Sequence, residues 1–314
     1  MASRSERIRA VTAHIMRLAW YHDLRASGRI DAVAARQHYF GFMSEIFTDV
    51  AVLRIDVGPV AENPGLEASD AGNDVEPSPA AGQKVPLTAI EPDSAVRGGI
   101  VVLHESREIP ESLLDLLRAL ALEGWLAVAP DLFHREGSRN SDDGSDDGGD
   151  DDKGDEVFGD NLFADFDATF DWLTARGVYP DSVGVIGFDD AGTAALIVAT
   201  NRPVGAAVSV AAGGILEPLN CDAVALTVAA PSLKAPWLGL FGEDDPKAPP
   251  EHVEALREAA TRASVATNVV TYSGLRHQAD AAPSLGSAED LDPALAALAE
   301  AQLRIFDWFD SFLR

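Results

Sequence analysis

The sequence predicts an α/β fold: a mostly parallel central sheet flanked by helices, with a helical extension at the N-terminus. Short apolar runs alternate with amphipathic segments along most of the 314 residues. The run Gly98–Leu103, a helix from about Ser112 to Leu122 and the run Trp125–Ala129 follow one another within about 30 residues, which is a βαβ unit. Several later runs end in turns rich in Gly, Pro and charged residues, as strands of such a sheet do. This length suits one large domain with an appendage.

Residues 1–48 are predicted to form the helical extension. Ile8, Val11, Ile15 and Leu18 recur at helical spacing, and a second helical segment follows. Seven arginines against four acidic residues make this piece net basic inside an acidic protein. Two interpretations remain open: an appendage that packs an aromatic face on the main body, or a dimerisation arm or lid.

Residues 49–314 are predicted to form the α/β domain. Apolar runs and alternation predict strands at Val50–Val57, Lys84–Ile90, Gly98–Leu103, Trp125–Ala129, Val183–Phe188, Ala206–Ala211, Pro236–Phe241 and Thr267–Tyr272. Helical periodicity predicts helices at Ser112–Leu122, Asn161–Ala175, Thr193–Thr200, Glu251–Arg262 and Leu295–Leu313. The first two strands are expected to pair as a hairpin.

Two acidic segments, residues 58–83 and 138–156, are predicted to be flexible loops because they contain almost nothing to bury. The aspartates of the second segment invite a calcium site. No register of that segment satisfies the EF-hand spacing, and no hydrophobic helices bracket it, so no metal site is expected.

The composition limits the partners and the compartment. The net charge of −27 argues against nucleic acid, because like charges repel. No apolar run approaches the roughly 20 residues that span a bilayer, and no secretory signal is visible. The single cysteine, Cys221, suits a reducing cytoplasm. A small-molecule substrate, a cytoplasmic location and a monomer or homodimer are expected; the acidic surface reflects either a salty interior or a composition bias.

The segment Pro180–Thr200 has the pattern of a nucleophile elbow, a strand, a sharp turn and a helix. The residues two positions either side of the apex must be small, as Gly187 and Ala191 are. The apex residue is Asp189, where Ser or Cys is usual. Turns at the ends of two later strands carry Asp245 and His277. Each alone is more typical of a turn former or a structural residue, but the order nucleophile, acid, histidine is that of the α/β-hydrolase fold.

From about residue 50 onward the chain resembles the dienelactone hydrolase family. The matching stretches are GGIVVLHE, EGWLAVAPDLFHREG, VGVIGFDDAG, AAVSVAAGGILEPL, APWLGLFGEDDPKAP and VVTYSGLRHQ. The resemblance implies one α/β-hydrolase domain without cofactor that hydrolyses lactones and related esters. It places the nucleophile at Asp189, the acid at Asp245, the histidine at His277 and the family's glutamate at Glu105. Asp190, Glu105 and Ser106 are expected to line the oxyanion site and pocket.

The elbow GFDDAG departs from the family pattern G-x-C-x-G-G, and Arg276 replaces the glycine that usually precedes the histidine. A carboxylate attacks an ester carbonyl poorly, but it can displace at an sp3 carbon of an epoxide or halide. The main hypothesis is hydrolysis of a small ester, lactone or related electrophile. The alternative is a degenerate relative that binds a ligand or partner, because Glu105, Asp189, Asp190 and Asp245 would repel one another and raise one pKa.

Overall fold

The computed structural model describes residues 46–53, 84–106, 109–135, 160–220, 223–273 and 288–313. Residues 1–45 of the predicted extension lie outside the described residues, as do the predicted loops 58–83 and 138–156. Cys221 and the candidate catalytic histidine, His277, also lie outside them.

Eight strands form one sheet in the order β1-β2-β4-β3-β5-β6-β7-β8. β2 runs antiparallel to both neighbours, and β3 to β8 are joined by parallel pairings. The strands are β1 Ile46–Val52, β2 Lys84–Ile90, β3 Gly98–Leu103, β4 Trp125–Pro130, β5 Val183–Phe188, β6 Ala206–Val210, β7 Trp237–Gly242 and β8 Thr267–Tyr272. The mostly parallel sheet confirms the predicted fold class.

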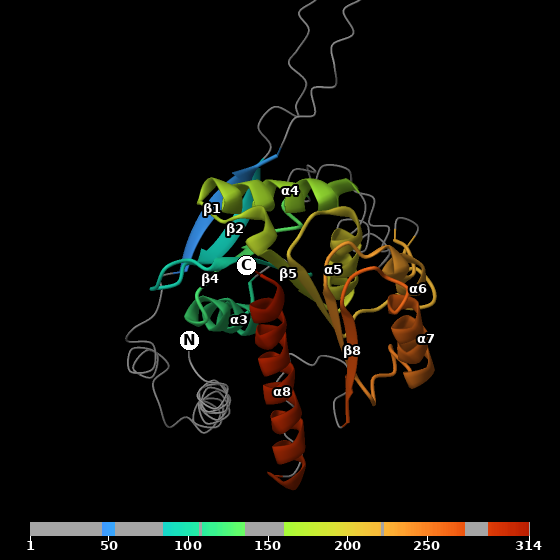
Figure 1. The fold of residues 1–314 in the computed structure, drawn as a ribbon. Helices are drawn as coiled ribbons and strands as arrows, with labels where there is room; N and C mark the ends of the chain where they lie inside the picture. Colours follow the sequence, from blue (N-terminus) through green and yellow to red (C-terminus); the bar gives the residue numbers. More distant parts are fainter. Residues whose placement is uncertain are drawn as a thin grey trace, which may run out of the picture.

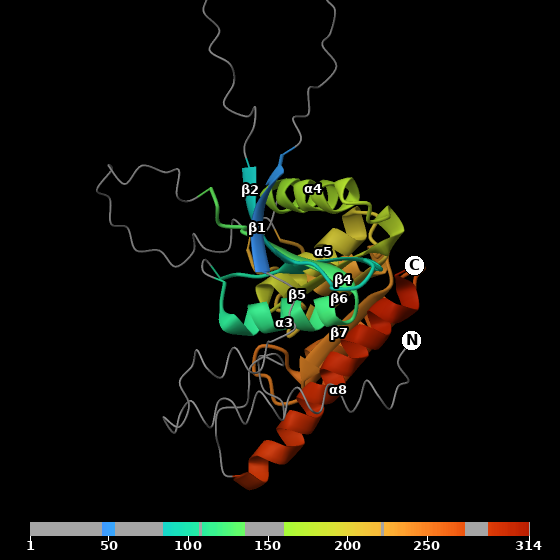
Figure 2. The ribbon, with the colours of Figure 1, turned by 90° about the vertical axis from the view of Figure 1, so that its left-hand side faces the viewer.

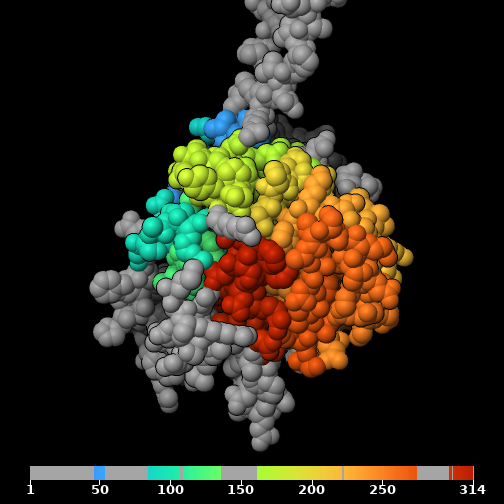
Figure 3. All heavy atoms as spheres, viewed as in Figure 1, coloured from blue at the N-terminus to red at the C-terminus, as the bar shows by residue number. Residues whose placement is uncertain are grey.

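Helices cover both faces of this sheet (Figures 1 and 2). They are α3 Glu111–Leu122, α4 Asp160–Ala175, α5 Asp190–Asn201, α6 Leu226–Ala229, α7 Pro250–Ala260 and α8 Ala288–Phe312. Figure 2 shows α4 and α5 on one side of the sheet and α3 and α8 on the other. In Figure 3, α8 (red) packs directly against the orange atoms of the β7–β8 region.

The core has two layers, one on each face of the sheet. On one face, α4, α5, α6 and α7 bury apolar side chains such as Phe166, Leu196 and Leu256. On the other face, α3 and α8 bury side chains such as Leu117 and Phe309. β3 is buried at all six positions, because both layers cover it. Its continuous apolar run, GGIVVL, is the sequence signal of such a strand.

Most elements lie close to their predicted bounds, and the hairpin of β1 and β2 is confirmed. The first strand was placed wrongly at Val50–Val57, since β1 runs over Ile46–Val52. β1 begins at Ile46, so residues 46–48 belong to a strand and not to the helical extension. Ile46 pairs with Ile90, and the ring of Phe47 lies 6.2 Å from that of Trp172 in α4. Pairing and packing with distant residues decide the start of this strand, and the local helical pattern does not include them.

Two helices also differ from the prediction. α8 begins at Ala288, seven residues before the predicted start. α6 was not predicted, because its four residues are too short to show a helical period. None of the helices in the described ranges combines the length and the apolarity that crossing a bilayer requires.

Candidate active site

The apex of the predicted elbow is Asp189, which lies between β5 and α5. Its backbone has φ 54° and ψ −128°, a strained conformation for a residue with a side chain. A Cβ on Gly187 would lie 1.9 Å from the carbonyl oxygen of Ala191, so only glycine fits two residues before the apex. The Asp189 N–H donates to the carbonyl of Val210 at 2.9 Å. The turn therefore has the tight strand–turn–helix geometry expected from the sequence, with a carboxylate at its apex.

Glu105 reaches the same turn from the neighbouring strand. β3 and β5 pair in parallel with Leu103 opposite Gly187, so the residues that follow each strand emerge side by side. Glu105 Oε1 accepts a hydrogen bond of 2.8 Å from the backbone N–H of Ala191. The sheet register thus brings Glu105 and Asp189 to one place, as the sequence predicted.

The electrostatic surroundings of Glu105 are unfavourable to its charge. Partial burial of its carboxyl group raises the pKa of Glu105 to about 7, and the charges of Asp190 and Asp189 act in the same direction. The backbone N–H groups of Ala191 and Asp190 oppose the shift. Glu105 as a whole residue is exposed, so the loss of solvation that raises its pKa applies to the carboxyl group, which lies against the elbow.

Asp190 is the first residue of α5, where a negative charge suits the helix dipole. Its Oδ1 lies 3.0 Å from where a Cβ on Gly213 would be, so the glycine after β6 leaves room for this side chain. Ser106 is half-buried directly after Glu105. Asp190 therefore lies at the elbow itself, whereas the backbone of Ser106 lies near the ring of His104.

Asp245 follows β7, which is separated from β5 by β6. The residue is 2% exposed, and its Oδ1 accepts a hydrogen bond of 2.8 Å from the N–H of Lys247. Of the four carboxylates expected to crowd one site, Glu105, Asp189 and Asp190 lie close together, because the charges of Asp190 and Asp189 act on Glu105. No group of His, Cys, Asp and Glu in the described ranges is arranged to hold a metal ion.

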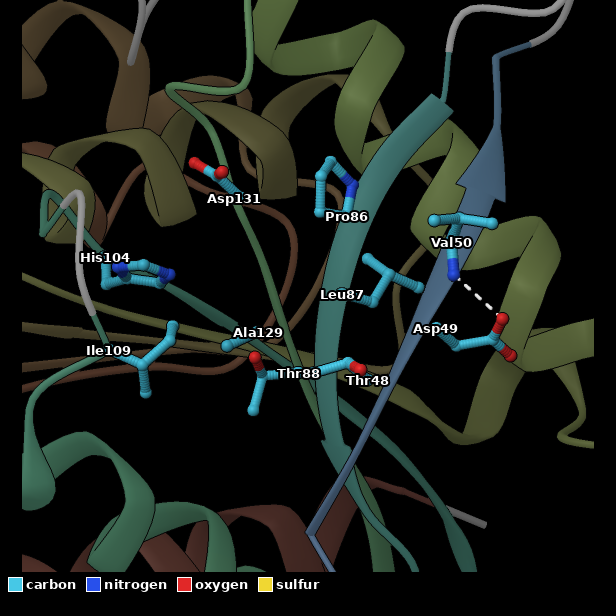
Figure 4. A pocket seen from close by; sticks show the side chains of 10 residues that line it. All are labelled: Thr48, Asp49, Val50, Pro86, Leu87, Thr88, His104, Ile109, Ala129 and Asp131. Atoms are coloured by element: carbon cyan, nitrogen blue, oxygen red, sulfur yellow. Dashed lines mark hydrogen bonds between the residues drawn. The ribbon is translucent and has the colours of Figure 1, made fainter. Parts of the chain in front are cut away.

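A cavity of about 500 Å³ opens beside this region, between the β1–β2 hairpin and the ends of β3 and β4. Neither Asp189 nor Asp245 lines it. Figure 4 shows His104, Ile109 and Asp131 on one side and residues of β1 and β2 on the other. The sequence prediction missed His104 and Asp131. The signal that could have found them was their position, each directly following a buried strand.

A second polar cluster joins the loop after β4 to α4. Asp165 is fully buried and accepts two hydrogen bonds from the guanidinium of Arg135, at 2.5 and 2.7 Å. Nε2 of His134 lies 3.2 Å from Oδ1 of the same carboxylate. Here the buried negative charge is matched by a bidentate cation.

The sheet order, the helices on both faces and the strained apex between β5 and α5 define the α/β-hydrolase fold. The model of the dienelactone hydrolase family matches residues 86–313. The chain belongs to the dienelactone hydrolase family.

Individual proteins agree with this assignment. A candidate carboxymethylenebutenolidase of Escherichia coli strain K12 is 29% identical over 217 residues, which cover 68% of this chain and 76% of that protein. One from Yersinia pestis is 27% identical over 237 residues, covering 74% of this chain and 85% of the other. The crystal structure of a candidate dienelactone hydrolase from Klebsiella pneumoniae has a TM-score of 0.62 at 21% identity. It covers 85% of this chain and 100% of its own, and shows the shared fold.

Proposed function

We propose that this protein hydrolyses a small ester, lactone or related electrophile, with Asp189 as the nucleophile and Asp245 and His277 as its acid and base. The observation that carries the proposal is the backbone of Asp189, with φ 54° and ψ −128° at the end of a buried parallel strand. Strain of this kind is kept where the surrounding structure enforces it, typically at functional sites. Membership of the dienelactone hydrolase family supports the reaction class.

In the first step an oxygen of the Asp189 carboxylate attacks the electrophilic carbon, and the bond from that carbon to the leaving oxygen breaks. The electron pair goes to the leaving oxygen, which takes a proton from solvent water as it departs. The N–H of Asp190, the residue after the apex, interacts with Glu105 in this structure. The proposal requires it to donate to the developing oxyanion when substrate is bound.

In the second step water attacks the covalent intermediate, an ester at an sp3 carbon or an anhydride at an acyl carbon. His277 takes a proton from that water, and Asp245 orients the imidazole and stabilises its protonated form. Cleavage releases the product and restores the Asp189 carboxylate, and the protonated His277 returns its proton to solvent, which balances the proton taken up by the leaving oxygen. Asp245 suits the orienting role because it is buried and held by the N–H of Lys247.

Glu105 is the carboxyl group beside the proposed nucleophile whose charge is disfavoured. With a pKa raised to about 7, Glu105 is protonated in a large fraction of molecules at neutral pH. A neutral Glu105 leaves one negative charge fewer beside the carboxylate of Asp189.

The test is a panel of p-nitrophenyl esters, lactones, epoxides and haloacids, assayed with the wild type and with Asp189→Asn. We expect kcat/KM to fall by at least about 10³-fold for any substrate turned over, because the nucleophile is lost. Asp244→Asn is the matched control, since Asp244 is exposed next to Asp245 and should leave activity unchanged. Activity retained by folded Asp189→Asn would refute the proposed nucleophile. A folded wild type inactive on the whole panel would favour the ligand-binding alternative.

A further inference from the structure

We propose that the cavity between the β1–β2 hairpin and the ends of β3 and β4 binds the uncharged organic part of the substrate, and that His104 anchors it by a hydrogen bond. This inference depends on the proposed function, because it assigns the cavity to the substrate of that reaction. It names a substrate class, uncharged esters or lactones with an apolar body.

His104 is the observation that points to a ligand. The residue is 7% exposed, and neither ring nitrogen has a hydrogen-bond partner within the part of the chain that the structure describes. Backbone groups of Pro130 and Ser106 lie near the ring without meeting hydrogen-bond geometry. Buried polar atoms nearly always have partners, because leaving one without costs about 1–3 kcal/mol. The ring borders the cavity in Figure 4, so a bound molecule can supply the missing partner.

The chemistry of His104 selects the group that it meets. Burial lowers the pKa of His104, which outweighs the opposing effects of Asp131 and the nearby backbone, so the imidazole is neutral at pH 7. A neutral imidazole offers one donor and one acceptor nitrogen. It can donate to an ester carbonyl or ether oxygen, or accept from a hydroxyl group, without requiring a charge on the ligand.

The walls of the cavity favour an apolar, uncharged body. Val50, Pro86, Leu87, Ile109 and Ala129 line it, together with two threonines, Thr48 and Thr88. No lysine or arginine is among the described residues that line it. A volume of about 500 Å³ lies within the range of small-molecule pockets.

Two carboxylates lie near the cavity, and only one of them bears on a ligand. Asp49 turns its carboxylate toward α4, where it accepts from Trp172 Nε1 at 3.0 Å and from Arg176 at 2.5 Å. Asp131 stays beside the cavity, held by a 2.9 Å bond from the N–H of Phe133. An anionic ligand would meet the charge of Asp131 in a protein of net charge −27, so anions are disfavoured.

The cavity is linked to the elbow through the end of β3. His104 is followed directly by Glu105, whose carboxylate accepts from the Ala191 N–H of the elbow. The backbone N–H of Asp131 donates to the carbonyl of Pro86 at 2.9 Å, which fixes the far wall to the same sheet. The proposal places the reacting carbon of the substrate at Asp189 and the rest of the substrate over the end of β3, in the cavity.

The binding experiment uses the full-length Asp189→Asn protein and two probes of matched size, benzyl alcohol and benzoate. Ring signals of isotope-labelled histidine are followed by NMR, with the His104 signal assigned by its absence from His104→Leu. We expect benzyl alcohol to shift the His104 signal saturably and benzoate to bind at least tenfold more weakly. Thr88→Phe, which fills the cavity, should abolish the shift, whereas Thr88→Ser should retain it.

The kinetic experiment separates this inference from the proposed function. With a neutral aromatic ester, His104→Leu should raise KM about tenfold at nearly unchanged kcat, and His104→Gln, which keeps hydrogen-bonding groups, should recover part of the loss. Saturable binding of benzyl alcohol with no hydrolysis by the wild type would support the cavity and refute the nucleophile. Two other outcomes would overturn this inference and leave the proposed function standing. In both, the wild type hydrolyses its substrate; in one, benzoate binds as tightly as benzyl alcohol, and in the other, benzyl alcohol does not shift the His104 signal.

Discussion

Two carboxylates in this molecule have opposite electrostatic surroundings. Asp165 is fully buried, and the bidentate guanidinium of Arg135 and the ring of His134 contact its carboxylate. Glu105, beside the elbow, has Asp190 and Asp189 as its charged neighbours and receives only backbone N–H groups from the described residues.

The difference indicates what each site does. A buried charge with matched partners holds two elements together, here the loop after β4 and α4, and removing one partner leaves the other uncompensated. A group of like charges does not stabilise the fold, because repulsion raises pKa values and opposes the packing of its members. Carboxylates with shifted pKa values gather at functional sites, which is consistent with the role proposed for the elbow.

The largest effect on stability is expected for Asp165→Asn. The change leaves the Arg135 charge without its carboxylate in a site where the guanidinium side chain is 19% exposed. We expect a loss of about 3–5 kcal/mol in the free energy of unfolding, the usual cost of breaking a buried pair. Denaturant titration monitored by circular dichroism measures it.

The matched control replaces both partners, with Asp165→Leu and Arg135→Met in one chain. Because no charge is then left alone, we expect most of the loss to be recovered. A loss below about 1 kcal/mol in Asp165→Asn would show that this pair does not hold the loop, and would remove the contrast with Glu105.

A smaller, pH-dependent effect of the opposite kind is expected at Glu105. Its pKa is raised from 4.5 to about 7 in the folded protein, so the folded state binds more protons than the unfolded state between these pH values. Its contribution to stability is present below about pH 4.5 and is lost as the pH rises toward 7. A fully buried group with that shift would lose roughly 3 kcal/mol, and exposure of Glu105 reduces the loss below that figure.

The comparison with Glu105→Gln isolates this effect, because glutamine keeps the size and cannot titrate. The free energy of unfolding of the wild type, minus that of the variant, should fall between pH 4.5 and 7 and stay level above it. A difference that rises with pH over this interval would mean that the Glu105 charge is stabilised at the elbow.

Much of the fold could be predicted from the sequence, because local patterns report burial. The runs Gly98–Leu103, Val183–Phe188 and Thr267–Tyr272 match β3, β5 and β8 residue for residue. The start of β1 at Ile46 could not be predicted so well, since it depends on pairing with Ile90 and on the packing of Phe47.

The tight turn of the elbow could also be predicted from the sequence GFDDAG and the strand before it, because Gly187 lies where a side chain would clash. The cavity could not be predicted in this way. Its walls come from strands that are distant in sequence, and His104 joins residues of β1 and β2 only through the sheet order. A sequence pattern within one continuous segment can therefore identify the elbow, but it does not show which distant strands supply the walls of a cavity. The roles of Asp189, Asp245 and His277 stay predictions for the activity assays.

The smallest effect on the free energy of unfolding is expected at a third carboxylate, Asp167. This residue is paired with an arginine as Asp165 is, but it is more exposed, so it distinguishes the effect of pairing from the effect of burial. Asp167 accepts two hydrogen bonds from Nε and Nη2 of Arg202, at 2.6 and 2.9 Å. This is a forked contact like that between Asp165 and Arg135, which uses both Nη atoms. The side chains of Asp167 and Arg202 are 32% and 30% exposed. Water already solvates both charges, so Asp167→Asn should cost about 1 kcal/mol or less by denaturant titration, and high salt should reduce that cost further. A cost equal to that of Asp165→Asn would mean that fork geometry alone, and not burial, determines how strongly such a pair holds α4 in place.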